Sequence, residues 1–427
     1  MKQSVLVVPC GSEIGLELYR SLSYSTHFKV IGGSSVDDHG KFVYENYIGG
    51  LPFVDDPNFI KILNEVIDAN DIQFVYPAHD SVVLKLAQAK AKGLLHCAVI
   101  TAPIETCEIA RSKLRTYQAF DGIIPIPKIF KMDKLEESDL PVFMKPEVGQ
   151  GSKGTHLAKS KEEVEFHLQR DASLLLLEYL PGKEYTIDCF TDRYGSLQMA
   201  EARERRRILN GISVNSASVH DQRFEQLAAK INHELTFRGA WFFQVKEDRS
   251  GELVLMEIAP RIAGTMGLIR CRGANLPLLS LFDALSYDID IFINDYEMVI
   301  DRALHNTYKH NLQYEHVYLD FDDLVIFDGK VNPGVMAFVY QCFNKGVQVH
   351  LLTKHKQDIH KTLEKYKLQG VFEDIIWLKD TENKSSFIKH RQAIFIDDSF
   401  AERKLIHDTC HIPVFDGHML ESLMEKD

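Results

Sequence analysis

The chain has 427 residues, 45% of them hydrophobic and 26% charged, with a formal net charge of -12. This length predicts two to four domains with cores of their own. The acidic balance argues against a general nucleic-acid-binding protein, which needs a basic face, and the absence of an apolar run of about 18 residues argues against a membrane span. Seven cysteines without a CxxC pair indicate reduced thiols. With a start that lacks the pattern of a signal peptide, these features favour a cytoplasmic protein.

The first hundred residues alternate between short apolar runs and amphipathic segments. We expect helices after the glycine turn at residues 10–15 and over 58–69 and 81–91. We expect strands at residues 3–9, 29–32, 72–77 and 97–101. Such alternation predicts a parallel α/β domain with helices on both faces of the sheet, here over residues 1–105. Because Gly11 and Gly15 lack the third glycine of a dinucleotide fingerprint, a tight turn is favoured over a cofactor site.

A glycine-rich loop with two lysines follows the next apolar run. The stretch VFMKPEVGQGSKG, residues 142–154, places Lys145 at the end of a strand and continues through Gly151, Ser152 and Lys153. Glycine lets backbone N–H groups approach an anion closely, and the lysines add charge suited to a polyphosphate. The spacing of a P-loop is absent. A lysine-flanked surface hairpin is the alternative interpretation.

Between residues 106 and 300 the pattern is that of an α+β domain. We expect helices over residues 107–120, 161–169 and 224–236 and strands over 174–178, 239–245 and 253–261. Glu257 interrupts an apolar strand, where an inward-facing charge is costly unless it meets a metal ion. An outward-facing glutamate on an edge strand is the alternative. Arg203 and Arg205 belong to a basic run that could equally be a solvated face.

These ordered motifs resemble the ATP-grasp superfamily over about residues 1–300, in the branch of carbamoyl-phosphate-synthase-like and pyrrolysine-synthesis-type ligases. The resemblance implies a pre-ATP-grasp domain at 1–105 and an ATP-grasp domain at 106–300. The implied ATP-binding residues are Lys113, Lys145, Gly151, Ser152, Glu178, Tyr179, Leu180 and Glu184. The implied residues of the substrate and phosphate side are Arg203, Arg205 and the catalytic Arg261, and the implied ligands of Mg²⁺ or Mn²⁺ are Gln244 and Glu257.

One position departs from the family pattern. The family usually reads Glu-x-Asn-Pro-Arg, whereas this chain has Ala259 in place of the asparagine. Alanine cannot coordinate a metal, so Mg²⁺ would depend on Glu257, Gln244, phosphates and water. The chemistry that the resemblance implies is phosphorylation of a small-molecule carboxylate by ATP, followed by attack of an amine and release of ADP and phosphate. The resemblance also implies a homodimer.

A second strand pattern begins at residue 316, after a polar linker at 301–315. Asp320 and Asp322 follow its first strand, Thr353 ends the next, and Asp397 ends a third. Carboxylates that leave parallel strands at one edge can meet the same phosphate, with Mg²⁺ offsetting their repulsion. Lys384 is the expected cation between them, with Lys379 and Lys389 as alternatives.

This arrangement resembles the haloacid-dehalogenase-like phosphohydrolases over residues 316–427. The resemblance implies a Rossmann-like domain in which Asp320 is the nucleophile, Asp322 the general acid and base, and Asp320, Asp322 and Asp397 the Mg²⁺ ligands. Thr353 and Lys384 complete the implied catalytic set, and the substrate would be a phosphorylated small molecule. The short connections between these motifs leave no room for a large cap.

The two halves together predict a bifunctional enzyme, an ATP-dependent carboxylate–amine ligase fused to a Mg²⁺-dependent phosphatase of the same small-molecule pathway. In the alternative hypothesis, motivated by Ala259, the first half is a nucleotide-binding scaffold that does not ligate and the phosphatase is the only catalyst. A third hypothesis is a nucleotide-sensing regulatory protein with two inactive sites. The presence of Asp320, Asp322 and Asp397 speaks against it.

Overall fold

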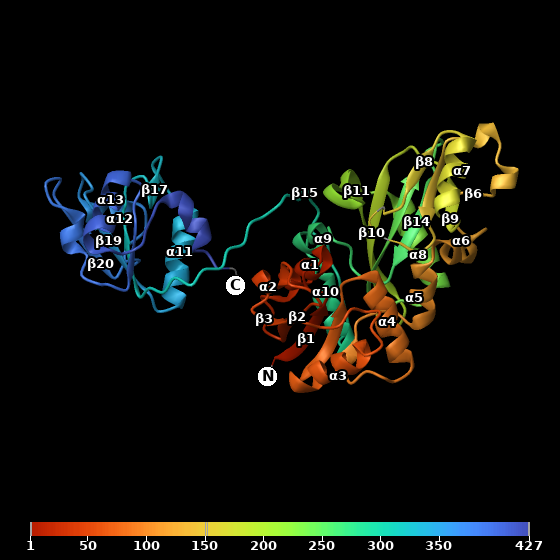
Figure 1. Ribbon diagram of the computed structural model, residues 1–427, viewed down its shortest axis with the longest axis horizontal. Helices are drawn as coiled ribbons and strands as arrows, with labels where there is room; N and C mark the ends of the chain where they lie inside the picture. Colours follow the sequence, from red (N-terminus) through yellow and green to blue (C-terminus); the bar gives the residue numbers. More distant parts are fainter. Residues whose placement is uncertain (1, 150, 152, 426–427) are drawn as a thin grey trace. The chain divides into compact units, whose positions relative to one another are not determined.

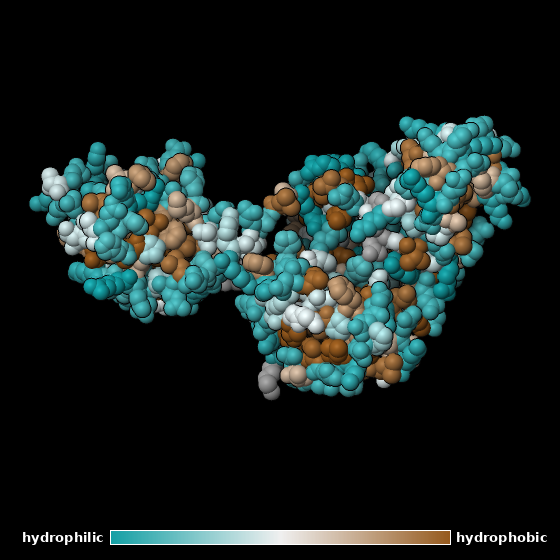
Figure 2. Space-filling model, in the orientation of Figure 1, coloured by the Kyte–Doolittle hydropathy of each residue, from teal (hydrophilic) through white to brown (hydrophobic). Residues whose placement is uncertain are grey.

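The computed structural model describes residues 2–149, 151 and 153–425 of the chain (Figure 1). It consists of two compact units, residues 1–304 and 305–427. The face seen in Figure 2 is mostly hydrophilic on each unit, with apolar residues gathered in small groups. Within the described residues, no helix is both long and apolar enough to cross a membrane.

The first unit begins with a five-stranded parallel sheet in the order β3-β2-β1-β4-β5. Its strands are β1 (Gln3–Val8), β2 (Phe28–Gly33), β3 (Asn46–Ile48), β4 (Ile72–Pro77) and β5 (Ala98–Val99). Its helices are α1 (Glu13–Leu22), α2 (Gly40–Val43), α3 (Phe59–Ala69) and α4 (Asp80–Ala91). Val5 packs with Leu18 of α1 on one face, and Leu6 packs with Leu63 of α3 on the other. This two-residue alternation confirms the predicted parallel sheet with helices on both faces.

Two antiparallel sheets make up the rest of this unit. The four-stranded sheet has the order β6-β9-β7-β8 and the six-stranded sheet the order β14-β13-β10-β11-β12-β15. The strands of the smaller sheet are β6 (Ile129–Phe130), β7 (Val142–Pro146), β8 (His156–Ala158) and β9 (Leu174–Glu178). The strands of the larger are β10 (Glu184–Thr191), β11 (Leu197–Leu209), β12 (Ile212–Val219), β13 (Gly239–Glu247), β14 (Leu253–Ala259) and β15 (Val299–Asp301). The helices are α5 (Ile104–Arg111), α6 (Lys113–Phe120), α7 (Lys161–Arg170), α8 (Gln222–Glu234), α9 (Gly267–Cys271) and α10 (Leu276–Ala284).

The single helix predicted over residues 107–120 is wrong, because the chain breaks it at Ser112. The backbone of Ser112 is extended, with φ -107° and ψ 117°, and its hydroxyl accepts a hydrogen bond from the N–H of Arg115 at 3.1 Å. A serine that caps a helix in this way competes with continuation of the preceding helix. The break makes Lys113 the first residue of α6, and its N–H donates to the carbonyl of Glu147 in the loop after β7.

The second unit is built on a five-stranded parallel sheet in the order β20-β19-β16-β21-β22. Its strands are β16 (His316–Leu319), β19 (Gln348–Thr353), β20 (Asp374–Trp377), β21 (Ala393–Ile396) and β22 (Val414–Phe415). Its helices are α11 (Pro333–Asn344), α12 (Ile359–Lys365) and α13 (Phe400–Cys410), with short 3-10 turns at Lys384–Phe387 and Gly417–Ser422. Phe338 and Leu363 cover one face, and Ile406 covers the other.

The connections of this second sheet are short at its carboxyl edge. Between β16 and α11 lies only the hairpin β17–β18, Ile326–Phe327 paired with Lys330–Val331, and no inserted domain interrupts the described residues 316–425. The predicted parallel sheet of the C-terminal unit is confirmed, and the described residues of this unit include no large cap. Because β16, β19 and β21 are parallel, the residues that follow them meet at one edge, which is where parallel α/β sheets place their ligands.

Candidate nucleotide and phosphate sites

A cavity of about 180 Å³ in the first unit is lined by residues of both antiparallel sheets and of α6. It brings together every predicted ATP-binding residue that the structure describes: Lys113, Lys145, Gly151, Glu178, Tyr179, Leu180 and Glu184. Ser152, predicted with them, lies outside the described residues. The walls also include Tyr117 and Met256, which add the apolar surface that a planar base requires. The arrangement can therefore enclose a purine at one end and phosphates at the other.

Two lysines dominate the charge of this cavity. Lys145 is only 6% exposed, and its ammonium donates to the carbonyl of Met256 at 3.5 Å. The ammonium of Lys113 donates to the carbonyl of Gly149 at 3.3 Å. Neither lysine forms an ion pair with a carboxylate in the part of the chain that the structure describes. Burial, and then the charge of Lys113, lowers the pKa of Lys145 to about 8. A bound anion would stabilise the charged form of both lysines.

The low pKa of Lys145 predicts that the affinity for MgATP falls as the pH rises. The ammonium loses its proton as the pH passes about 8, so the cation is present near pH 7 and largely lost near pH 9. Above that pKa the dissociation constant should rise by about tenfold per pH unit, because only the protonated lysine attracts phosphate. Fluorescence or calorimetric titration of MgATP across this pH range measures the change. Lys145→Arg, which stays protonated, should flatten the profile, and a steep profile in that variant would contradict the assignment.

On the acidic side of the cavity, Arg205 contacts Glu184 and Gln244. Its Nη1 donates to Glu184 Oε1 at 2.5 Å and to Gln244 Oε1 at 2.7 Å, while its Nε is buried and lacks a partner in the described residues. Gln244 and Glu257 are opposite one another on β13 and β14, and both line the cavity. Although β14 is an edge strand, Glu257 faces inward, and an outward-facing glutamate is excluded. A carboxylate and an amide oxygen are hard donors of the kind that hold Mg²⁺, whereas Ala259 supplies none.

A larger cavity of about 680 Å³ adjoins the first and shares Lys113, Arg205, Gln244 and Glu257 with it. Arg261 lines this second cavity, and its guanidinium contacts the carboxylate of Asp80 at 2.5 and 2.8 Å. Despite the desolvation of Arg261 on burial, the charge and hydrogen bonds of Asp80 raise its pKa, which keeps it cationic. Because they share lining residues, the two cavities are continuous with one another.

The arginine run is not a solvated face at its first two positions. Arg203 is 1% exposed, its Nε donates to Asp188 at 2.8 Å, and its Nη1 donates to the hydroxyl of Thr265. Arg203 still lines the larger cavity, with its charge compensated by Asp188, and its predicted role on the substrate side stays a prediction. Arg205, only 7% exposed in its side chain, lines both cavities.

Asp80 and Arg111 are among the residues of the larger cavity that sequence reasoning did not single out. Asp80 begins α4 just after β4, at the carboxyl edge of the parallel sheet, a position that could have signalled a functional residue. Arg111 ends α5 and donates to the hydroxyl of Ser81 at 3.3 Å, and it has no carboxylate within ion-pair distance among the described residues. It adds a cation to the wall of the larger cavity.

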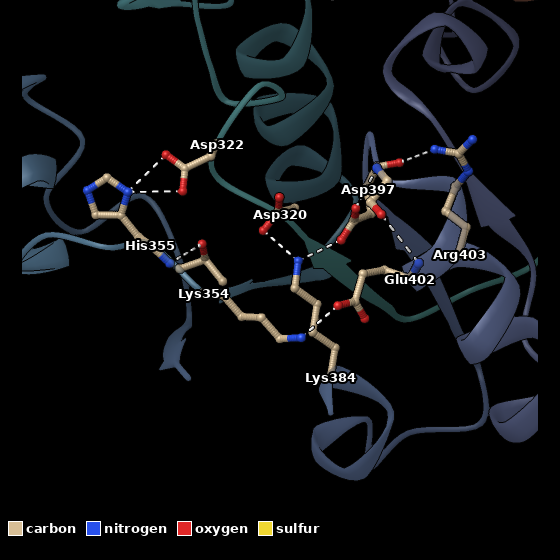
Figure 3. Close-up of polar contacts among 10 residues, drawn as sticks. Asp320, Asp322, Lys354, His355, Lys384, Asp397, Glu402 and Arg403 are labelled. Carbon is tan, nitrogen blue, oxygen red and sulfur yellow. Dashed lines mark hydrogen bonds and ion pairs between the residues drawn. The ribbon is translucent and has the colours of Figure 1, made fainter. Parts of the chain in front are cut away.

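In the second unit a lysine joins the strand-end aspartates (Figure 3). The ammonium of Lys384 donates to Asp320 at 2.7 Å and to Asp397 at 2.6 Å, and all three side chains are at most 10% exposed. Oxygens of Asp320, Asp397 and Asp398 lie within 4.8 Å of one another. Lys379 and Lys389, the alternatives for the lysine role, are both exposed, so the structure selects Lys384.

The pKa values of both Asp320 and Lys384 are raised in this cluster. Burial, together with the neighbouring Asp397, raises the pKa of Asp320, and Lys384 opposes this. Burial also works against the charge of Lys384, but its two carboxylates outweigh it and raise the lysine pKa. A bound cation would stabilise three adjacent carboxylates in the same manner. The cluster is therefore suited to a divalent ion and a phosphate.

Asp322 lies outside that cluster of close carboxylates, and its predicted role as a metal ligand stays a prediction. Both of its oxygens contact Nδ1 of His355, at 2.9 and 3.0 Å, and its side chain is half exposed. Asp398 takes its place in the group of close carboxylates. Asp322 follows the end of β16, where the chain turns toward His355 (Figure 3), a residue that sequence reasoning did not single out. Thr353 is fully buried, and its hydroxyl accepts from the N–H of His355 at 3.2 Å.

Residues 170–299 match a family described as ATP-grasp in the biosynthetic pathway with Ter operon. The chain is similar to biotin carboxylase of Campylobacter jejuni in a complex with beta-gamma-ATP: TM-score 0.59, identity 13%, and coverage of 70% of this chain and 75% of that one. The chain is also similar to N5-carboxyaminoimidazole synthetase of Staphylococcus aureus, with a TM-score of 0.54 and 14% identity. The match covers 66% of this chain and 78% of that one. A third similar structure is L-amino acid ligase of Bacillus licheniformis, with a TM-score of 0.53 and 16% identity. The match covers 67% of this chain and 74% of that one.

No curated protein matches the chain. The second of the solved relatives has also been determined with ADP, and a related carboxylase domain with MgADP and bicarbonate. These likenesses concern the fold, and they agree with the cavity that gathers the predicted nucleotide residues. The family match over residues 170–299 and the fold of the first unit agree with the ATP-grasp superfamily that its motifs predicted.

Proposed function

We propose that residues 1–304 catalyse the ATP-dependent joining of a small-molecule carboxylate to an amine, with release of ADP and phosphate. The observation that carries this proposal is a pair of lysines, buried Lys145 and partly buried Lys113, that lie beside Glu257 without an ion-pair partner among the described residues. Their cavity continues into a second, arginine-lined one. The names of two similar proteins, an amino acid ligase and a carboxyaminoimidazole synthetase, support this reaction class. The finer branch predicted from the motifs stays a prediction.

The residues of the two cavities divide the work between them. Lys113 and Lys145 hold the phosphates of ATP, and Glu178 to Leu180 line the end suited to adenine. Arg261 and Arg111 attract the acceptor carboxylate, whose oxygen attacks the γ-phosphorus and expels ADP. The amine then attacks the acyl carbon, phosphate leaves, and the nitrogen loses its proton. Mg²⁺, held by Glu257 and Gln244, would neutralise the phosphate charge.

The second candidate for this unit is a scaffold that binds nucleotide without ligating. Ala259 favours it, because the carbon side chain removes an oxygen donor at the metal side of the cavity. Glu257, Gln244 and Arg205 together still present hard donors and a cation to the same space. The ligase is therefore the better supported of the two.

For residues 305–427 we propose a Mg²⁺-dependent phosphatase of the haloacid-dehalogenase type, acting on a phosphorylated small molecule of the same biosynthetic pathway. The Asp320–Lys384–Asp397 cluster at the carboxyl edge of a parallel sheet supports it. Asp320 would attack phosphorus to form an aspartyl phosphate, and Asp322, turned from His355, would protonate the leaving alcohol. Water, activated by Asp322 in the second step, would release phosphate and restore Asp320.

The ligase is tested in an Asp320→Asn protein, which separates it from phosphate released by the second unit. We expect ADP and phosphate to appear in equal amounts only when MgATP, a pool of carboxylates and a pool of amines are all present. Subtracting members of each pool then identifies the substrates by coupled ADP assay and mass spectrometry. Tight MgATP binding with no turnover in broad pools would reject the ligase in favour of the scaffold.

A further inference from the structure

Three histidines meet on the second unit away from the aspartates. His316 begins β16, His350 lies within β19, and His390 precedes β21. One ring nitrogen from each lies within 4.8 Å of the other two. Because Asp320 follows β16 at its other end, the histidines and the aspartate cluster are about 13 Å apart along the strand. The proposed phosphatase does not use this histidine cluster.

The sheet register brings the histidine cluster together. His350 is paired with Tyr318 on β16 and with Asp374 on β20, and side chains of paired residues in a parallel sheet share a face. His316, two residues before Tyr318, falls on that same face. Nδ1 of His316 and Nε2 of His350 are 3.1 Å apart. Two nitrogens bound to one tetrahedral zinc ion are separated by about 3.3 Å, so this spacing needs little adjustment.

The outer nitrogens of two of these rings already have partners. Nδ1 of His350 contacts the carboxylate of Asp374 at 3.2 Å, which requires a proton on that nitrogen and leaves Nε2 bare. Nδ1 of His390 contacts the hydroxyl of Tyr318 at 2.7 Å, leaving its Nε2 for the cluster. Metal-binding histidines characteristically make such contacts through the nitrogen that does not bind the ion.

From this geometry we propose that His316, His350 and His390 form a site for a borderline-soft divalent cation of the zinc type, with a fourth position open to water. The rings of His316 and His390 are stacked, 3.5 Å apart and 8° from parallel. Because the lone pairs of stacked rings run parallel, the ring of His390 would have to rotate out of this stacking to bind the same ion as His316. His316 and His390 are only partly buried, so the ion enters from solvent. Three imidazoles select zinc over Mg²⁺, which prefers oxygen.

The test is a titration of the metal-free full chain with Co²⁺ in excess Mg²⁺, followed by displacement with Zn²⁺. We expect one equivalent of Co²⁺ with the visible absorption of a tetrahedral site. His390→Gln and His316→Gln should each weaken binding by at least about 100-fold, and Asp374→Asn, a positioning residue, by about 10- to 100-fold. His407→Gln, on α13 with a side chain 66% exposed and outside the histidine cluster, is the matched control and should bind as the natural chain does.

Circular dichroism and thermal unfolding in chelator must show that each variant is folded like the natural chain. Absence of a stoichiometric Co²⁺ spectrum in the natural chain would overturn the proposal. Unchanged affinity in His390→Gln would do the same. Binding that survives in His390→Gln but disappears in Asp397→Asn would assign the ion to the aspartate cluster instead.

Discussion

Replacing Asp320 with asparagine is expected to lower phosphate release from phosphomonoesters by at least about 10³-fold, because the amide cannot act as the attacking carboxylate. The change preserves the size of the side chain, which is buried against Lys384. The fold should survive because Asp397 still pairs with that lysine at 2.6 Å. The measurement is phosphate release from p-nitrophenyl phosphate and a panel of phosphorylated sugars, acids and nucleosides in Mg²⁺.

The matched control is Asp328→Asn, which removes one carboxylate from the exposed turn of the β17–β18 hairpin. Asp328 has a left-handed backbone, φ 49°, which asparagine also adopts readily. This control should keep full activity. If Asp320→Asn retained most of the phosphatase rate with a broad panel, Asp320 would not be the nucleophile. If the natural chain released no phosphate from any substrate of the panel, the phosphatase proposal itself would be rejected.

Replacing Glu257 with glutamine should lower ADP formation by the first unit by about 10²- to 10³-fold, the cost of losing a charged group that stabilises phosphoryl transfer. Glu257 lines both cavities, and its charge acts on both Lys113 and Lys145. Removing that charge takes one nearby acid away from both lysines. Binding of metal-free ATP should therefore be unchanged or tighter while the Mg²⁺-dependent turnover falls. The two quantities are measured by calorimetric titration and by a coupled ADP assay.

Glu252→Gln is the control for this second change, since Glu252 is exposed in the turn that leads into β14 and lines neither cavity. It should keep both the affinity and the rate. An equal loss of ATP affinity and turnover in Glu257→Gln would instead mean that the carboxylate supports the fold of the cavity. A turnover that persists with unchanged Mg²⁺ dependence would exclude Glu257 as a metal ligand.

Local sequence signals determined much of this protein. The two-residue alternation of Val5 and Leu6 and the strand-end positions of Asp320 and Asp397 depend on short stretches of chain. The positions of the lysines and glycines in and after β7 also depend on one short stretch of chain. Their elements form where the sequence predicted them because each hydrophobic period agrees with the burial it receives.

Other features were decided by contacts between residues far apart in the chain. Arg203 pairs with Asp188 and lines only the larger cavity, whereas Arg205 pairs with Glu184 and lines both, although the two arginines look alike in sequence. Asp322 contacts His355 and lies outside the cluster of Asp320, Asp397 and Asp398. The histidine cluster arises from the pairing of β16 with β19 and with β21, which no single stretch encodes. In each case the outcome is a competition among polar partners for a buried charge or hydrogen bond, and that competition exists only once the sheets have assembled.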